Sequence, residues 1–140
     1  MNKTSSFAEQ LKKGNTITYY TLGVSMRPLL KARASHVTIV PCEYAEADDI
    51  VLYVRQNGDY VLHRLIKQAD GVYYMRGDNT YYLEKISASQ IIGKVAYIYK
   101  GDTVIDVDSN LMYKLYVKFW NKIFPIRFLM QRFKLKIKKI

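Results

Sequence analysis

Cysteine and proline are scarce in this chain of 140 residues, which holds one cysteine, Cys42, and three prolines. A single cysteine cannot form an internal disulfide, and no spacing of Cys and His residues suggests a zinc site. The sequence therefore predicts no disulfide scaffold, and nothing in it calls for a metal or another cofactor.

Long apolar runs are also missing. No stretch reaches the roughly 18 uncharged apolar residues of a membrane-spanning helix. The first residues, MNKTSSFAEQLKKG, lack the apolar segment of a secretory signal. We therefore expect neither a transmembrane helix nor a cleavable signal, and a location in the cytoplasm or peripherally on a membrane.

Acidic residues are absent from position 109 onward. Residues 1–108 hold 13 basic and 12 acidic side chains, whereas residues 109–140 hold nine basic ones and no acid, so the tail carries nearly all of the net charge of +10. The length supports one domain with a real core. We expect this domain over residues 1–108, followed by a basic tail over residues 109–140.

The pattern of residues 1–108 predicts a mainly β domain. Ser6 followed by Glu9 is a capping box, and Gly14 is a plausible stop, so a short helix is expected near residues 6–13. The turn dipeptides Asn57-Gly58 and Asp70-Gly71 favour antiparallel hairpins. Seven β-rich runs follow the helix, at residues 16–24, 36–40, 49–55, 59–66, 71–76, 91–100 and 102–107.

The tail has the pattern of basic amphipathic helices. Its apolar residues recur at helical spacing, and Lys114, Lys118 and Lys122 form a separate row. Pro125 is expected to break or kink this helix and to disfavour a helical Phe124. A second basic segment with the same spacing follows the proline.

Two interpretations of the tail stay open. Its apolar and aromatic side could bind the surface of an anionic membrane while Lys and Arg meet the headgroups. Alternatively, residues 111–124 pack against the β domain and the lysines are simply solvated. Nucleic acid is disfavoured as a partner, because the aromatic residues fall on the apolar stripe instead of interleaving with the lysines.

Two segments of the β region have features of a catalytic site. Ser25 follows a strand-like run and precedes Pro28, which favours a rigid corner with an exposed hydroxyl. His63 lies alone among apolar residues of a predicted strand, where it is either a hydrogen-bonded core residue or a general base. Asp78, after the next strand, could orient its ring or belong to an ordinary turn.

The order of these motifs resembles the type I signal peptidase superfamily, which includes the self-cleaving SOS repressors. The resemblance covers roughly residues 21–101 and is strongest to the branch of the endoplasmic reticulum and archaea, in which the general base is His. It rests on five blocks in order, Ser25-Met26-Arg27-Pro28, Asp49-Ile50-Val51, His63-Arg64, Gly77-Asp78-Asn79 and Ile92-Gly93-Lys94-Val95.

By this resemblance Ser25 is the nucleophile, its backbone N–H the oxyanion donor, and His63 the general base. Asp78 matches the first acid of the family pattern. Glu84 stands where the branch usually has a further Asp, so either carboxylate is a candidate to orient His63. Gly23 occupies the place of a helper hydroxyl found in some bacterial members and cannot supply one.

The resemblance implies a serine endopeptidase that forms an acyl-enzyme and cleaves a leader, signal or precursor peptide after small residues. The substrate would bind as an extended strand. Residues 1–24 contain no Ala-Gly or Cys-Gly bond, so cleavage in trans is expected instead of self-cleavage. The alternative is a non-catalytic binding module with a peptidase fold, whose tail contacts a membrane or nucleic acid.

Overall fold

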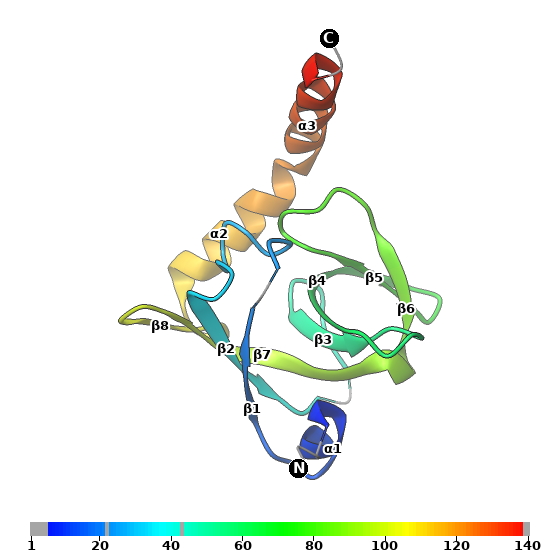
Figure 1. Cartoon of the computed structure of the whole chain (residues 1–140), viewed down its shortest axis with the longest axis vertical. Coiled ribbons are helices and arrows are strands. Elements are labelled where there is room, and N and C mark those ends of the chain that lie inside the picture. The colour runs from blue at the N-terminus through cyan, green and yellow to red at the C-terminus, as the bar shows by residue number, and fades with distance from the viewer. Residues whose placement is uncertain (1–5, 22, 43, 139–140) are drawn as a thin grey trace. The chain divides into compact units, whose positions relative to one another are not determined.

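The computed structural model describes residues 6–21, 23–42 and 44–138. They form an N-terminal helix, a curled sheet of eight antiparallel strands and two C-terminal helices (Figure 1). The mainly β fold class is thus confirmed. In chain order the elements are α1 (Phe7–Lys12), β1 (Ile17–Tyr20), β2 (Ser35–Val40), β3 (Ile50–Val54), β4 (Tyr60–Ala69), β5 (Val72–Arg76), β6 (Glu84–Ser87), the 3-10 turn η1 (Ala88–Gln90), β7 (Ile91–Lys100), β8 (Thr103–Asp106), α2 (Leu111–Lys122) and α3 (Phe124–Lys138).

The helix α1 begins and ends where the sequence predicts. The Ser6 side chain accepts a hydrogen bond from the Glu9 N–H, which caps the first turn. Gly14 follows the last turn with a φ of 86°, a backbone conformation that favours glycine. The predicted helix near residues 6–13 is therefore confirmed.

All seven predicted runs contain a strand, and β6 is an eighth strand that the sequence pattern did not predict. The strands follow the order β1-β2-β7-β3-β4-β5-β6 across the sheet, and β8 pairs with β7. The hairpin between β4 and β5 turns at Asp70 and Gly71, which both have positive φ, as a two-residue type I′ turn requires. Figure 1 shows that the sheet curls around its concave face.

The hydrophobic core of the sheet holds side chains from β3 to β7. Leu65 and Met75 on adjacent strands are both fully buried, and Tyr53 lies among them although it carries a hydroxyl. A buried hydroxyl needs a hydrogen-bond partner, so the surroundings of Tyr53 bear on function. The cluster consists of Ala45, Val51, Tyr53, Leu65, Tyr73, Met75, Ile86 and Ile91.

The chain divides into two compact units, Met1–Ser109 and Asn110–Ile140. In the second unit, the Asn110 side chain accepts a hydrogen bond from the Tyr113 N–H and caps α2. The helical path is interrupted at Ile123, as the proline predicts, but Phe124 is helical. Pro125 lies in the first turn of α3, where the missing N–H would have no partner within the helix. Across the described residues, no helix is both long and apolar enough to cross a membrane.

Candidate active site

Ser25 lies in a loop between β1 and β2 that is tied to the turn after β5. The Ser25 carbonyl accepts a hydrogen bond from the Asn79 N–H at 2.7 Å, and the Val24 carbonyl accepts one from the Asn79 side chain at 3.1 Å. The Asp78 N–H donates to the Met26 sulfur at 3.3 Å. Three contacts thus hold the serine loop in a defined position, and Met26 is buried.

His63 lies on β4 and is 4% exposed. Its Nδ1 atom is 3.2 Å from the Tyr53 hydroxyl, which in turn donates to Glu84 Oε1 at 2.7 Å. The guanidinium of Arg55 binds both oxygens of Glu84, each at 2.8 Å. A continuous series of contacts therefore joins the imidazole, through a phenol, to a carboxylate held by an arginine.

The charges along this series determine the tautomer of His63. The hydrogen bonds from Arg55 hold the pKa of Glu84 below its ordinary value, so this carboxylate is ionised and can only accept. Burial and the bond to Glu84 raise the pKa of Tyr53, so its hydroxyl keeps its one proton and donates it to Glu84. Towards His63 the hydroxyl can only accept, so Nδ1 carries the imidazole proton and Nε2 is the basic nitrogen.

Burial also keeps His63 neutral. Desolvation lowers the pKa of His63 from 6.5 to about 4, although the negative charge of Glu84 acts in the opposite direction. An imidazole with this pKa is unprotonated at neutral pH, which is the state that a general base requires.

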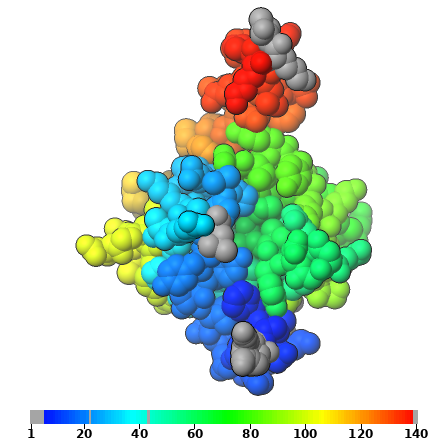
Figure 2. Space-filling view, viewed as in Figure 1, coloured from blue at the N-terminus to red at the C-terminus, as the bar shows by residue number. Residues whose placement is uncertain are grey.

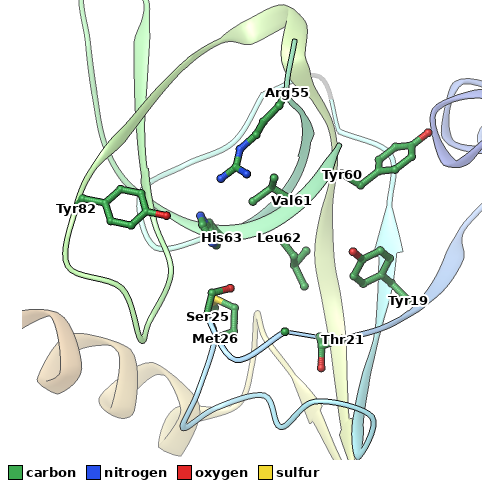
Figure 3. Close-up of a pocket in the computed structure, with 11 residues that line it drawn as sticks. Tyr19, Thr21, Ser25, Met26, Arg55, Tyr60, Val61, Leu62, His63 and Tyr82 are labelled. Carbon is green, nitrogen blue, oxygen red and sulfur yellow. The ribbon is translucent and has the colours of Figure 1, made fainter. Parts of the chain in front are cut away.

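Gly77 brings the basic nitrogen close to the serine loop. A Cβ atom at this position would lie 2.5 Å from the Ser25 carbonyl oxygen and 3.2 Å from His63 Nε2. Only a residue without a side chain fits between the two segments. Figure 3 shows Ser25 and His63 next to one another at the pocket, with the serine on its loop and the imidazole on β4.

Two groups at the site, the Ser25 N–H and His63 Nε2, have no hydrogen-bond partner among the described residues. Within the part of the chain that the structure describes, the Ser25 N–H makes no hydrogen bond inside the protein. In the same residues, the contact with Tyr53 is the only side-chain hydrogen bond of His63. The Nε2 atom is therefore not yet bonded to Ser25, and in free enzymes such contacts often tighten only when substrate binds.

Asp78 has a different partner. Both of its carboxylate oxygens accept hydrogen bonds from Arg64 at 2.8 Å, and the two side chains are almost fully buried. Arg64 also donates to the Asp48 carbonyl. This ion pair joins β4 to the turn after β5, and so it positions the segment that holds the serine loop.

A pocket of about 400 Å³ contains both Ser25 and His63. It lies between β1 and β4, and Figure 2 shows the surface of β1, in blue, beside that of β4, in green. Its lining is mixed, with polar and apolar side chains, and consists of Tyr19, Thr21, Gly23, Ser25, Met26, Arg55, Tyr60, Val61, Leu62, His63 and Tyr82.

The backbone beside this pocket has open strand edges. The strand β1 is at one end of the sheet order. Residues 60–63 of β4 pair with β3, whereas β5 pairs with β4 only from Arg64 onward. Among the described residues, β1 and the first half of β4 therefore both border the pocket with unpaired backbone groups, which an extended peptide can use.

The four candidate residues from the sequence thus have distinct places. Ser25 and His63 line one pocket, Glu84 reaches His63 through Tyr53, and Asp78 pairs with Arg64. The roles of Tyr53, Arg55 and Gly77 were not predicted from the sequence. The described residues contain no cluster of His, Cys, Asp or Glu that could hold a metal ion.

The signal that could have revealed Tyr53 is the register of one hairpin. Opposite Val51 stands His63, and opposite Tyr53 stands Val61. Tyr53 and His63 are therefore diagonal neighbours on the same face of two adjacent strands, within reach of an aromatic side chain.

No family model matches the sequence, and no curated protein matches it either.

Proposed function

We propose that this protein is a serine endopeptidase of the signal peptidase type, which cleaves a leader, signal or precursor peptide in trans. The observation that carries the proposal is the shared pocket of Ser25 and a buried, neutral His63 whose basic nitrogen lies on the side of the serine loop. The order of sequence blocks that resembles this superfamily supports the same activity.

In the proposed mechanism, His63 Nε2 takes the proton of Ser25 Oγ while the oxygen attacks the carbonyl carbon of the scissile peptide bond. The Ser25 N–H stabilises the resulting oxyanion. The imidazolium then returns its proton to the departing amine as the C–N bond breaks, which leaves an acyl-enzyme. His63 then takes a proton from water as the water oxygen attacks the ester carbon, and the imidazolium returns this proton to Ser25 Oγ as the ester C–O bond breaks, which releases Ser25 and the acid product.

Tyr53 and Glu84 act through His63 and are positioning residues. When the imidazole becomes positively charged, its Nδ1–H donates to the Tyr53 oxygen, whose own proton points to the Glu84 carboxylate. The phenol thereby transmits the favourable effect of a negative charge to the imidazolium. In this proposal the Tyr53–Glu84 pair takes the part that a directly bonded aspartate has in a Ser-His-Asp triad.

The substrate is proposed to bind as an extended strand between β1 and residues 60–63 of β4. Both segments offer unpaired backbone groups next to Ser25. The preference for small side chains before the cleaved bond follows from the family resemblance.

Labelling with an alkyl fluorophosphonate, together with cleavage of a quenched peptide library rich in Ala, tests the proposal. We expect the wild-type protein to be labelled and to cleave peptides after small residues. Ser25→Ala and His63→Gln should each lower both rates at least about a thousandfold, because the nucleophile and base act as a unit.

The matched controls are Ser109→Ala, at an exposed serine, and His36→Gln, at the other histidine of the chain. Both should be labelled like the wild type. Labelling that persists in Ser25→Ala would contradict the assignment of the nucleophile. Peptide binding without labelling or cleavage would favour a non-catalytic module instead.

A further inference from the structure

The helix α3 has an apolar stripe that is open to solvent. Five large apolar side chains recur at intervals that place them within about 100° of one another around the helix. All are at least half exposed: Ile126 60%, Leu129 67%, Met130 55%, Phe133 64% and Ile137 51%. We call this set the α3 stripe.

Basic residues border the α3 stripe on both sides. At 100° per residue, Lys134 and Lys138 fall on one side of its centre, and Lys136 and Arg132 fall on the other, each about 70° to 130° away. All four side chains are exposed. This arrangement is typical of helices that lie in a membrane interface, where long basic side chains reach headgroups from the edges of the apolar face.

The helix α2 also has exposed apolar residues beside basic ones. Its exposed apolar residues are Leu111 68%, Met112 75%, Leu115 55% and Phe119 60%, and Lys114 and Lys118 lie beside one edge of them. At the junction of the two helices, the Ile123 N–H donates to the Phe119 carbonyl and the Arg127 N–H donates to the Ile123 carbonyl. Each of the two helices thus has an exposed apolar face accompanied by basic residues.

The net positive charge of residues 109–140 indicates which kind of partner could cover these exposed apolar faces. Residues 109–140 hold nine basic side chains and no acidic one. A second copy of the chain would bring two strongly positive helices together, and their repulsion opposes self-association. An anionic lipid bilayer has an apolar interior that can cover the exposed apolar side chains. Its negatively charged headgroups can pair with the basic residues. We propose that the exposed apolar faces of α2 and α3 bind the surface of an anionic lipid bilayer, with the helices in the interface plane.

The test uses the full-length protein and co-sedimentation with vesicles of phosphatidylcholine containing about 30% phosphatidylglycerol. Phe133→Glu places a charge in the α3 stripe. Leu135→Glu is the matched control, since Leu135 is 49% exposed on the opposite side of α3 and the net charge changes equally. Burial of one large side chain is expected to account for at least a tenfold difference. Phe133→Glu should therefore lower the partition coefficient about tenfold or more, and Leu135→Glu less than about threefold.

The experiment has clear contrary outcomes. Equal weakening by the two variants would mean that charge alone attracts the tail, and it would overturn docking through the stripe. The proposal would also be overturned if the wild-type protein did not sediment with these vesicles. The same holds if it formed a dimer through the α3 stripe or bound single-stranded RNA instead of lipid. Equal helical content of both variants by circular dichroism establishes that the comparison concerns the surface and not folding. Because no step depends on Ser25 or His63, failure of the peptidase proposal would leave this one intact.

Discussion

Replacement of Tyr53 by Phe removes the one atom that connects His63 to Glu84. The Tyr53 ring is fully buried, so Phe can occupy the same space. The substitution deletes the bonds of 3.2 Å to His63 Nδ1 and 2.7 Å to Glu84, while Glu84 keeps both bonds to Arg55. The main loss is therefore the acceptor for the imidazole proton.

The expected size of the effect follows from the positive charge that His63 carries in the transition state of the proposed mechanism. A hydrogen bond to a charged group contributes about 1.5–3 kcal/mol. Its loss corresponds to a rate lower by about tenfold to a hundredfold. Tyr53 does not line the pocket, so the affinity for a ligand in the pocket should stay unchanged.

The assay is inactivation by an alkyl fluorophosphonate, which separates the limiting rate constant from the concentration for half-saturation. Tyr53→Phe should lower the rate constant and leave the half-saturating concentration as in the wild type. Tyr73→Phe is the matched control, because Tyr73 belongs to the same buried cluster. A rate constant for Tyr53→Phe that equals that of Tyr73→Phe would refute the proposed role of the phenol.

Three further predictions concern the surroundings of the proposed catalytic pair, Ser25 and His63. Gly77→Ala should slow fluorophosphonate labelling at least about tenfold, because the new Cβ would lie 2.5 Å from the Ser25 carbonyl and displace the loop; unchanged labelling would contradict this. Asp78→Asn should lower the free energy of unfolding in urea by about 3 kcal/mol, since it removes the negative charge that binds the buried Arg64 guanidinium through two hydrogen bonds; a loss below about 1 kcal/mol would mean that the pair is not structural. Burial lowers the pKa of His63 from 6.5 in the unfolded chain to about 4 in the folded protein. Between these two pH values the unfolded chain binds a proton at His63 that the folded protein does not, so the free energy of unfolding falls as the pH drops from about 6.5 to 4. Urea unfolding should give a free energy of unfolding about 2–3 kcal/mol lower at pH 4.5 than at pH 7 because of His63, and this contribution should be absent in His63→Gln. An equal pH dependence in both proteins would refute the effect assigned to the burial of His63.

Much of the fold could be predicted because its signals are local. Ser6 and Glu9 define the start of α1, and Asp70-Gly71 supplies the positive φ values that a tight hairpin needs. The strand β6 escaped prediction since it has four residues and only Ile86 is buried, so its extended conformation depends on pairing with β5. A pattern of two periods is too short to distinguish such a strand from a loop.

The prediction from Pro125 was correct for the position of the helix break and wrong for the conformation of Phe124. The break between α2 and α3 falls at Ile123, close to Pro125. Phe124 was expected to be non-helical, yet it begins α3, because a proline in the first turn removes an N–H that has no helical partner. The steric preference of a residue before proline for an extended conformation did not keep Phe124 from starting α3.

The sequence alone determined the mainly β domain, the acid-free basic tail and the candidate pair Ser25 and His63, because composition, periodicity and ordered motifs are properties of neighbouring residues. Only the tertiary structure showed which carboxylate is connected to the histidine. Asp78 lies 14 positions after Arg64 and pairs with it, whereas Glu84 lies 31 positions after Tyr53 and reaches His63 through it. Such contacts depend on strand register and on the curl of the sheet, and neither is encoded in any short segment.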